Sequence, residues 1–184
     1  IKRSRDVSNR LSKGIEFLMK KNKITHIAGT GKLTSKTTLE VKNGKKTKIV
    51  EADKIIIATG ARPRSFPGME YDGERIISYK EAMVLNALPK KMIIIGSGAI
   101  GSEFAYYYNE FGTEIHMVEM LDRMLPIEDI DVSKEVEKSF KKVGIKVSTG
   151  TKVSKIESLK TKVKVYIEKN GKEEILEGDV ALLA

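Results

Sequence analysis

The chain is predicted to be an α/β protein in which a parallel sheet is followed by short antiparallel strands. Residues 92–147 alternate apolar runs of strand length with amphipathic helical segments, a pattern typical of right-handed crossovers between parallel strands. Residues 153–184 consist of short strand-like segments, and residues 37–58 show a similar pattern earlier in the chain. A hydrophobic content of 40% with 32% charged residues is normal for a globular protein.

The first part of the chain is predicted to contain one helix and several strands. In residues 5–23 one apolar stripe recurs at helical spacing, formed by Val7, Leu11, Ile15 and Leu18. The strands expected after it are 24–28, 37–41, 48–51 and 55–58, with a tight turn at Asn43-Gly44. Proline and glycine interrupt every periodic pattern in residues 63–73, which indicates a linker.

The second part is predicted to follow the order strand, helix, strand, helix, strand. The three strands are expected at 92–95, 114–119 and 145–147, and the helices at 98–111 and 131–143. One face of the first helix carries Ile100, Phe104, Tyr107 and Phe111. Further strands are expected at 153–156, 163–168, 174–176 and 180–184, with a turn at Asn170-Gly171.

Two stretches resemble each other, which suggests an internal duplication. Each has an Asn-Gly pair, then an aspartate, then an apolar run; Gly44 lies 14 residues before Ala58, and Gly171 lies 13 before Ala184. The alternative is that any two hairpins with Asn-Gly turns look alike. If the duplication is real, the chain is an internal piece of a longer protein. Residues 1–70 would then end one domain, and residues 75–184 would form nearly all of the next.

The composition excludes several classes of function. The chain has no cysteine and two histidines, so it cannot form a disulfide, a thiolate metal site or a multi-histidine metal site. Its formal charge is +9, but the lysines are spread along the chain without interleaved aromatic residues, so nucleic-acid binding is not expected. No apolar run approaches the roughly twenty residues of a membrane span. With no secretory signal at its start, the chain is expected to be cytoplasmic.

The strand at 92–95 leads directly into a glycine motif that opens the next helix, Gly96-Ser97-Gly98-Ala99-Ile100-Gly101. In this context the first glycine permits a tight turn, the second lets a pyrophosphate approach the backbone, and the third lets helix and strand pack closely. The helix N-terminus then receives the phosphates. The motif therefore predicts a Rossmann-like dinucleotide-binding domain; a glycine-rich turn without a ligand is the alternative.

Glu119 ends the second parallel strand, 21 residues after Gly98, where an acidic side chain is expected to bind the adenosine ribose 2′-hydroxyl. At about 5 Å and an effective dielectric near 20, this carboxylate would repel a 2′-phosphate by roughly 3 kcal/mol per charge pair. NAD is therefore favoured over NADP. Arg123 is the counter-argument because it could meet a phosphate, although a solvated loop arginine is the simpler interpretation.

The other ionisable side chains give weaker signals. By spacing alone, Glu103 favours no more than an interaction with the positive helix start. No metal site is expected from the acidic side chains near the second helix, which suit a helix start: Glu128, Asp129 and Asp131. His26 and His116 lie on predicted strands without a partner motif and are expected to be structural.

Taken in order, four stretches resemble the pyridine nucleotide–disulfide oxidoreductases, and within that family the lipoamide dehydrogenase branch. They are residues 55–63 (IIIATGARP), residues 96–105 (GSGAIGSEFA), Val118-Glu119 and Met124-Leu125-Pro126. The ordered set covers essentially the whole chain and is more specific than the glycine motif alone. Ile100 argues for the lipoamide branch, because glutathione reductases carry a tyrosine there.

The resemblance implies an FAD domain, an inserted NAD domain and a dimer domain. NAD would be held by Gly96, Ser97, Gly98, Ala99, Ile100, Gly101 and Glu103, with Glu119 on its ribose and the Val153 backbone on its adenine. FAD would meet Gly31 through its adenine and Thr59, Gly60 and Ala61 beside the flavin nucleotide. Glu103 would lie near the flavin ring and pair with a lysine, which makes it the one catalytic position implied within this chain.

The resemblance also implies what the parent protein does. The parent would oxidise dihydrolipoamide to lipoamide through a redox disulfide and FAD, reduce NAD, form a homodimer and join a 2-oxo acid dehydrogenase complex. The redox cysteines and the acid–base pair are missing here, so the 184-residue chain is expected to be inactive. The alternatives are another flavin disulfide reductase, an NADH oxidase or a non-catalytic dinucleotide-sensing domain.

Overall fold

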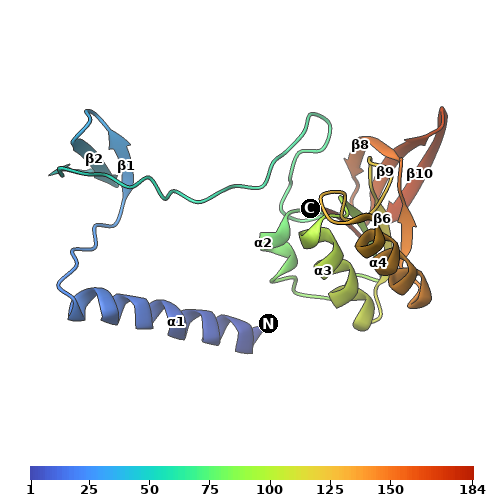
Figure 1. Ribbon diagram of the computed structural model, residues 1–184, viewed down its shortest axis with the longest axis horizontal. Coiled ribbons are helices and arrows are strands. Elements are labelled where there is room, and N and C mark those ends of the chain that lie inside the picture. Colours follow the sequence, from blue (N-terminus) through green and yellow to red (C-terminus); the bar gives the residue numbers. More distant parts are fainter. The chain divides into compact units, whose positions relative to one another are not determined.

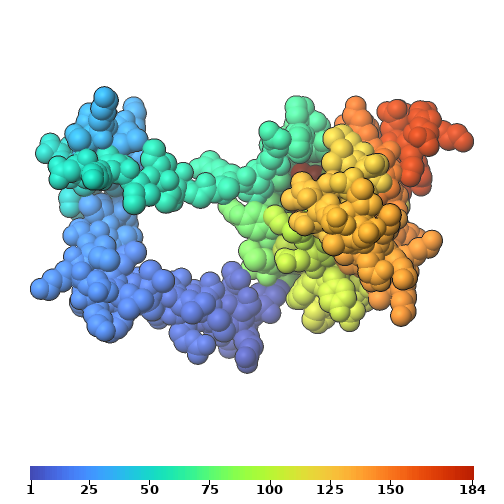
Figure 2. Space-filling view, in the orientation of Figure 1, coloured from blue at the N-terminus to red at the C-terminus, as the bar shows by residue number.

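The computed structural model describes residues 1–184 and divides into two compact units, Ile1–Ala61 and Arg62–Ala184. In Figures 1 and 2 the first unit runs from blue to cyan and the second from green to red. No helix combines the length and the apolar character that crossing a membrane requires. The cytoplasmic location remains a prediction.

The first unit contains one helix and a small antiparallel sheet. Helix α1 (Lys2–Lys21) confirms the expected helix and is followed by β1 (Thr30–Leu33), β2 (Thr38–Asn43) and β3 (Lys46–Glu51). The strands pair in chain order, β1-β2-β3. No residue of α1 is buried, and Val41 on β2 is the one buried hydrophobic side chain of this unit. The apolar stripe of α1 therefore has no partner in this unit.

Two of the strand predictions in the first unit are wrong. Residues 24–28 are irregular, because Lys23 has φ +56° where the helix ends, and pairing with β2 starts only at Thr30. Residues 55–58 form no strand either, and Ile56 is 90% exposed. An apolar run of this kind becomes a buried strand only between neighbouring strands, and none pairs with it.

The second unit is built on a five-stranded parallel sheet, which confirms the predicted Rossmann-like α/β class. Its strands are β4 (Ile76–Ile77), β5 (Lys91–Ile95), β6 (Glu114–Val118), β7 (Lys146–Ser148) and β11 (Val180–Leu183), in the order β4-β11-β5-β6-β7. Helix α3 (Ala99–Glu110) connects β5 to β6, and α4 (Ile130–Lys142) connects β6 to β7. The short α2 (Tyr79–Ala82) follows β4.

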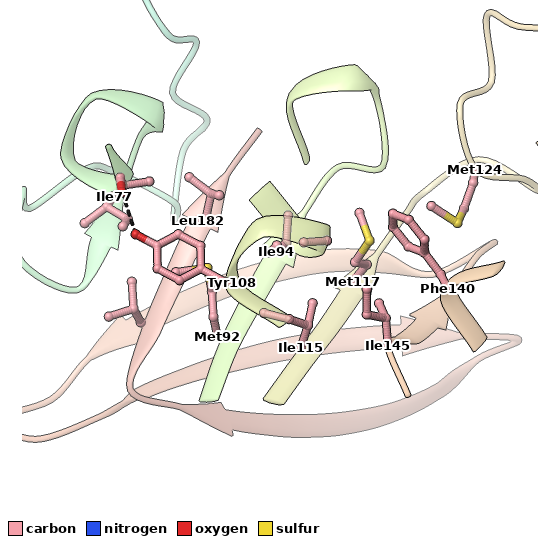
Figure 3. Packing of buried hydrophobic residues seen from close by; sticks show 13 residues of the cluster. Ile77, Met92, Ile94, Tyr108, Ile115, Met117, Met124, Phe140, Ile145 and Leu182 are labelled. Carbon is pink, nitrogen blue, oxygen red and sulfur yellow. Dashed lines mark hydrogen bonds between the residues drawn. The ribbon is translucent and has the colours of Figure 1, made fainter. Parts of the chain in front are cut away.

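The two faces of this sheet are covered differently (Figure 1). Helices cover one face, and the antiparallel strands β8 (Lys152–Ser158), β9 (Val163–Lys169) and β10 (Lys172–Gly178) cover the other. Along β5 the side chains alternate: Met92 and Ile94 enter the helix-side core shown in Figure 3, and Ile93 enters the core under the antiparallel strands. Apolar residues at consecutive positions are thus explained by a sheet buried on both faces.

Helix α3 is buried on a face that its hydrophobicity did not predict. Ile100, Tyr107 and Phe111 are 46%, 51% and 58% exposed, and Phe104 is only partly buried. The buried positions are instead Gly101, Ser102, Ala105 and Tyr108. At Gly101 the helix lies so close to the end of β5 that no side chain fits, whereas Tyr108 near the end of the helix packs in the helix-side core.

The two antiparallel sheets allow the two similar stretches to be aligned on their hairpin turns instead of on their Asn-Gly pairs. In the β2–β3 hairpin the turn lies between Asn43 and Lys46, so it starts at Gly44; in β9–β10 it starts at Asn170. Measured from the first turn residue, the spacing is 14 in both copies, from Gly44 to Ala58 and from Asn170 to Ala184. The duplication itself remains a prediction, since only the second copy closes onto a buried strand, β11.

The segment 63–73 is not a free linker. Phe66 and Met69 form a β-bridge, and the Gly68 carbonyl accepts a hydrogen bond from the Ile156 N–H at 2.9 Å. Met69 and Tyr71 pack against the core under the antiparallel strands. Residues 66–71 therefore pack with the second unit, within the stretch 63–73 that the proline and glycine pattern predicts as a linker.

Candidate nucleotide-binding site

The glycine motif lies at the carboxyl end of the central strand β5, at the point where the order of successive strands in the sheet reverses. The chain continues from β5 to β6 and β7 on one side, whereas β11 pairs with β5 on the other. In open α/β sheets, ligands bind at the carboxyl ends of the strands at such a switch point. The Gly96 N–H donates to the Val118 carbonyl of β6 at 2.9 Å, which fixes the loop to the neighbouring strand.

Two of the three glycines are required by the protein itself. Gly96 has φ +103°, and a Cβ built there would lie 2.2 Å from the Ala184 carbonyl oxygen. A Cβ on Gly101 would lie 2.2 Å from the Gly96 carbonyl oxygen. Both distances are too short for real atoms, so these two glycines set the turn and the close helix–strand packing.

Gly98 differs from the other two glycines. It is the N-cap of α3, with φ −68°, and a Cβ there would meet no atom within 4 Å. No steric contact within the protein therefore requires glycine at this position. The open space above the backbone at the start of α3 fits the approach of a pyrophosphate to free N–H groups.

Ser97, between the first two glycines, is fully buried and joins the loop to Glu119. Its N–H and its Oγ donate hydrogen bonds to the same carboxylate oxygen, Glu119 Oε2, at 2.8 and 2.9 Å. Its carbonyl oxygen accepts from the Leu125 N–H at 3.0 Å and from Ser102 Oγ at 3.2 Å. Sequence reasoning assigned Ser97 to the motif but did not predict these contacts.

Glu119 lies where the sequence places it, after β6, and is 8% exposed. Its second oxygen, Oε1, accepts a hydrogen bond from the Leu121 N–H at 2.9 Å. Its backbone N–H donates to the Ser148 carbonyl, and its carbonyl accepts from the Thr151 N–H, both at 2.9 Å. The carboxylate is thus held at both oxygens beside the glycine loop.

Arg123 is not a solvated loop residue. Its side chain is 35% exposed, its Nη2 donates to the Pro126 carbonyl at 2.8 Å, and its Nε is buried without a partner. The guanidinium folds onto its own loop, which corrects the solvated interpretation. Neighbouring Met124 is fully buried, and Leu125 has φ +45°, unusual for a residue with a side chain.

The other residues assigned to NAD lie on two elements. Ala99, Ile100 and Glu103 are exposed on the first turns of α3. Val153 is on β8, two residues after Thr151, whose N–H is bound to Glu119. The glycine loop, Glu119 and the start of β8 are therefore neighbours. The Glu103 side chain makes no hydrogen bond or ion pair. No interaction in this chain tests the catalytic role of Glu103.

The residues assigned to FAD do not form a site in this chain. Gly31 lies in β1 opposite Val41, and Thr59, Gly60 and Ala61 lie in an irregular stretch. All four are exposed, and no hydrogen bond joins Gly31 to the other three. The residues present do not fit FAD by themselves.

Neither histidine joins the candidate site. His116 Nε2 lies 2.9 Å from Ser148 Oγ, and burial lowers the pKa of its ring. His26 is exposed on an irregular segment rather than on a strand. Among the acids, Asp129 caps α4 by accepting from the Asp131 N–H at 2.8 Å. No group of three or more histidine or acidic side chains is placed to hold a metal ion.

Comparison with known proteins identifies the family. A family described as pyridine nucleotide-disulphide oxidoreductase matches residues 2–184. The chain is 47% identical over 150 residues to a dihydrolipoyl dehydrogenase from Zymomonas mobilis, which covers 81% of this chain and 32% of that protein. It is 43% identical over 186 residues to one from Mycobacterium leprae, which covers 99% of this chain and 40% of that protein.

Solved structures agree with this result. LpdA from Mycobacterium tuberculosis is similar over 86% of this chain and 35% of its own, with a TM-score of 0.78 and 32% identity. The flavoprotein disulfide reductase RclA from Escherichia coli matches 100% of this chain and 41% of its own, with a TM-score of 0.88 and 26% identity. The chain spans 32% to 40% of the length of its curated relatives. It belongs to the pyridine nucleotide-disulfide oxidoreductase family, which implies binding of FAD and a nicotinamide nucleotide.

Proposed function

We propose that this chain is the nicotinamide-nucleotide-binding part of a dihydrolipoyl dehydrogenase and that its nucleotide is NAD. The observation that carries the proposal is the open backbone at Gly98, between two glycines that the protein itself requires and beside the buried Glu119. The dehydrogenase assignment is supported by relatives of that name that are 40% to 47% identical.

The geometry supports the following roles for the chain's residues in this proposal. The N–H groups at the start of α3 bind the pyrophosphate, and Gly98 leaves the space for it. Glu119 binds the adenosine ribose at the end of β6, and the backbone of Val153 lies beside the adenine at the start of β8. The nicotinamide ring of bound NAD supplies the hydride acceptor. In the parent protein, electrons from dihydrolipoamide reach it through residues outside this chain.

Selectivity for NAD rests on the charge of Glu119 and on what surrounds it. A 2′-phosphate would face this carboxylate at a cost of roughly 3 kcal/mol at 5 Å and a dielectric near 20. Arg123 is directed away from that charge, because its Nη2 donates to the Pro126 carbonyl and its Nη1 lies 3.9 Å from Asp122 Oδ1. NADPH is therefore expected to bind more weakly than NADH.

Titration calorimetry of the 184-residue chain with NADH and NADPH tests the proposal. The chain is expected to bind NADH more tightly, and Glu119→Ala is expected to narrow the difference between the two nucleotides. Equal affinities in the unaltered chain would count against the role of Glu119. Absence of binding by both nucleotides would count against the whole assignment.

The parent protein's homodimer, its place in a 2-oxo acid dehydrogenase complex and its lipoamide substrate are part of the same proposal. A second candidate, another flavin disulfide reductase, is favoured by the match of RclA over the whole chain. The higher identity to the dihydrolipoyl dehydrogenases supports the first. Assay of the complete parent with dihydrolipoamide separates them, because a different disulfide reductase would leave NAD unreduced.

A further inference from the structure

Ser97 occupies a position that the glycine motif leaves free, yet all of its polar atoms are engaged. The motif specifies positions 96, 98 and 101 and accepts any residue between the first two glycines. Ser97 is nevertheless fully buried, donates twice to Glu119 Oε2 and accepts twice at its carbonyl. A fully buried, fully bonded polar side chain in a nucleotide loop points to a specific task.

The two bonds to Oε2 fix the Glu119 carboxylate from the loop side. A carboxylate offers about four acceptor positions, and three are used here, two on Oε2 and one on Oε1 by the Leu121 N–H. Bonds to a charged acceptor are the strong ones, and several bonds restrict its rotation. The remaining acceptor position is on Oε1. The carboxylate is thus oriented by donors that belong to the protein itself.

The loop after Glu119 holds Ser97 from the other direction. The Leu125 N–H donates to the Ser97 carbonyl, and the Leu125 carbonyl accepts from Ser133 Oγ at 3.3 Å. Leu125 adopts φ +45°, a conformation that costs a leucine free energy and persists where surrounding bonds enforce it. The glycine loop is therefore clamped between Glu119 and Leu125.

We propose that Ser97 is a positioning residue for the nicotinamide nucleotide and acts through Glu119. Its hydroxyl holds the carboxylate and the glycine loop in one arrangement, so that the nucleotide meets a preformed site. The inference rests on the proposed NAD binding of this chain. In Ser97→Ala the two backbone bonds to the carboxylate, from the Ser97 and Leu121 N–H groups, remain, but Oε2 loses its hydroxyl donor, so the carboxylate is held less tightly in the orientation that faces the ribose.

A double-mutant cycle on NADH affinity tests this, using the chain with Ser97→Ala, Glu119→Ala and both changes. Losing a hydrogen bond to a charged group corresponds to roughly a tenfold weaker affinity, which is expected for Ser97→Ala alone. In the Glu119→Ala background the same change is expected to have less than a twofold effect. Thr113→Val is the matched control: it removes a buried hydroxyl, bound to the Pro89 carbonyl at the opposite end of β6, and is expected to lower the melting temperature without changing the NADH affinity.

The outcomes separate this inference from the proposed function. If the unaltered chain does not bind NADH, the proposed function fails. If it binds NADH and Ser97→Ala stays within twofold, only the positioning role fails. An equal loss in both backgrounds would mean that Ser97 does not act through Glu119 and would also overturn the inference. Should Ser97→Ala not fold by circular dichroism, Ser97→Cys, which replaces the hydroxyl with a slightly larger and much weaker donor, takes its place in the same cycle.

Discussion

Gly101→Ala is expected to lower the free energy of unfolding, whereas Gly98→Ala is expected to lower NADH affinity with little change in stability, although both glycines belong to one motif. A Cβ on Gly101 would lie 2.2 Å from the Gly96 carbonyl oxygen and 3.3 Å from Ile94 Cγ2. An ordinary contact between these atoms needs about 1 Å more. Since the nearer neighbour is backbone, helix α3 must move away from β5. Overpacking of this kind costs about 1–3 kcal/mol, and we expect the upper end.

At Gly98 the same substitution meets no atom within 4 Å, and φ −68° is favourable for alanine. Loss of a glycine N-cap costs up to about 1 kcal/mol, and the reduced freedom of the unfolded chain returns about 0.4–1 kcal/mol. The free energy of unfolding is therefore expected to change by less than about 0.5 kcal/mol. NADH affinity is expected to fall at least tenfold, because the new methyl group occupies the space of the pyrophosphate.

Thermal unfolding followed by circular dichroism, together with NADH titration calorimetry, measures both effects. At about 3–5 °C per kcal/mol for a unit of this size, Gly101→Ala is expected to lower the melting temperature by about 10 °C. Gly98→Ala is expected to melt within about 2 °C of the unaltered chain. Undiminished NADH binding by Gly98→Ala would refute the assignment of the open space to the nucleotide. An unchanged melting temperature for Gly101→Ala would refute the packing argument.

Three further predictions concern stability and composition. Tyr108→Phe is expected to lower the free energy of unfolding by about 1–2 kcal/mol, because the Tyr108 hydroxyl donates to the Ala82 carbonyl in the helix-side core (Figure 3). Burial raises the pKa of Tyr108 to about 12, so this donor stays protonated near neutral pH. A denaturant titration with an unchanged midpoint would contradict the contribution of this hydrogen bond. Hydrogen bonds from Ser78 lower the pKa of Glu81, so the contribution of this carboxylate to stability is present above the ordinary glutamate pKa and is lost as the pH falls through the lowered value. Glu81→Gln is therefore expected to reduce the fall in the free energy of unfolding at acid pH. An unchanged slope of that free energy against pH would contradict this prediction. The purified 184-residue chain is expected to lack the visible absorbance of bound flavin, because Gly31 and residues 59–61 form no site; a stoichiometric yellow complex would overturn that.

The strands that were predicted correctly are those that pair with another strand in a sheet. Met92, Ile93 and Ile94 are all apolar because β5 is buried on both faces, so a short apolar run followed by a glycine motif was enough to locate it. The same kind of run at 55–58 predicted a strand that does not form. Strand character in a sequence indicates a preference, and pairing partners decide whether it is realised.

The buried face of α3 was predicted wrongly from hydrophobic periodicity, for a different reason. Periodicity selected a face formed by Ile100, Phe104, Tyr107 and Phe111, but the helix buries Gly101, Ser102, Ala105 and Tyr108. At Gly101 the close approach to β5 leaves no room for a side chain. A glycine that serves packing carries no apolar signal. Glycine spacing contained this information, since the third glycine of the motif is the one that permits close helix–strand packing.

Part of the candidate site was predictable and part was not. The motif and the strand that ends at Glu119 located the loop and the acid, because both follow local spacing. The contacts between Ser97 and Glu119, and between Ser97 and Leu125, join residues 22 and 28 positions apart and depend on how the loops fold back. A serine accepts many partners, so the sequence alone did not indicate which one it binds.

The central claim, that the loop at the end of β5 is a nicotinamide-nucleotide site, is tested most directly by mapping NADH onto the backbone. Amide chemical shifts of the isotope-labelled chain, recorded during titration with NADH, report which N–H groups meet the nucleotide. The largest changes are expected at Gly96–Gly101, at Glu119 and at the start of β8 near Val153. Changes confined to other parts of the chain, or none at saturating NADH, would contradict the claim.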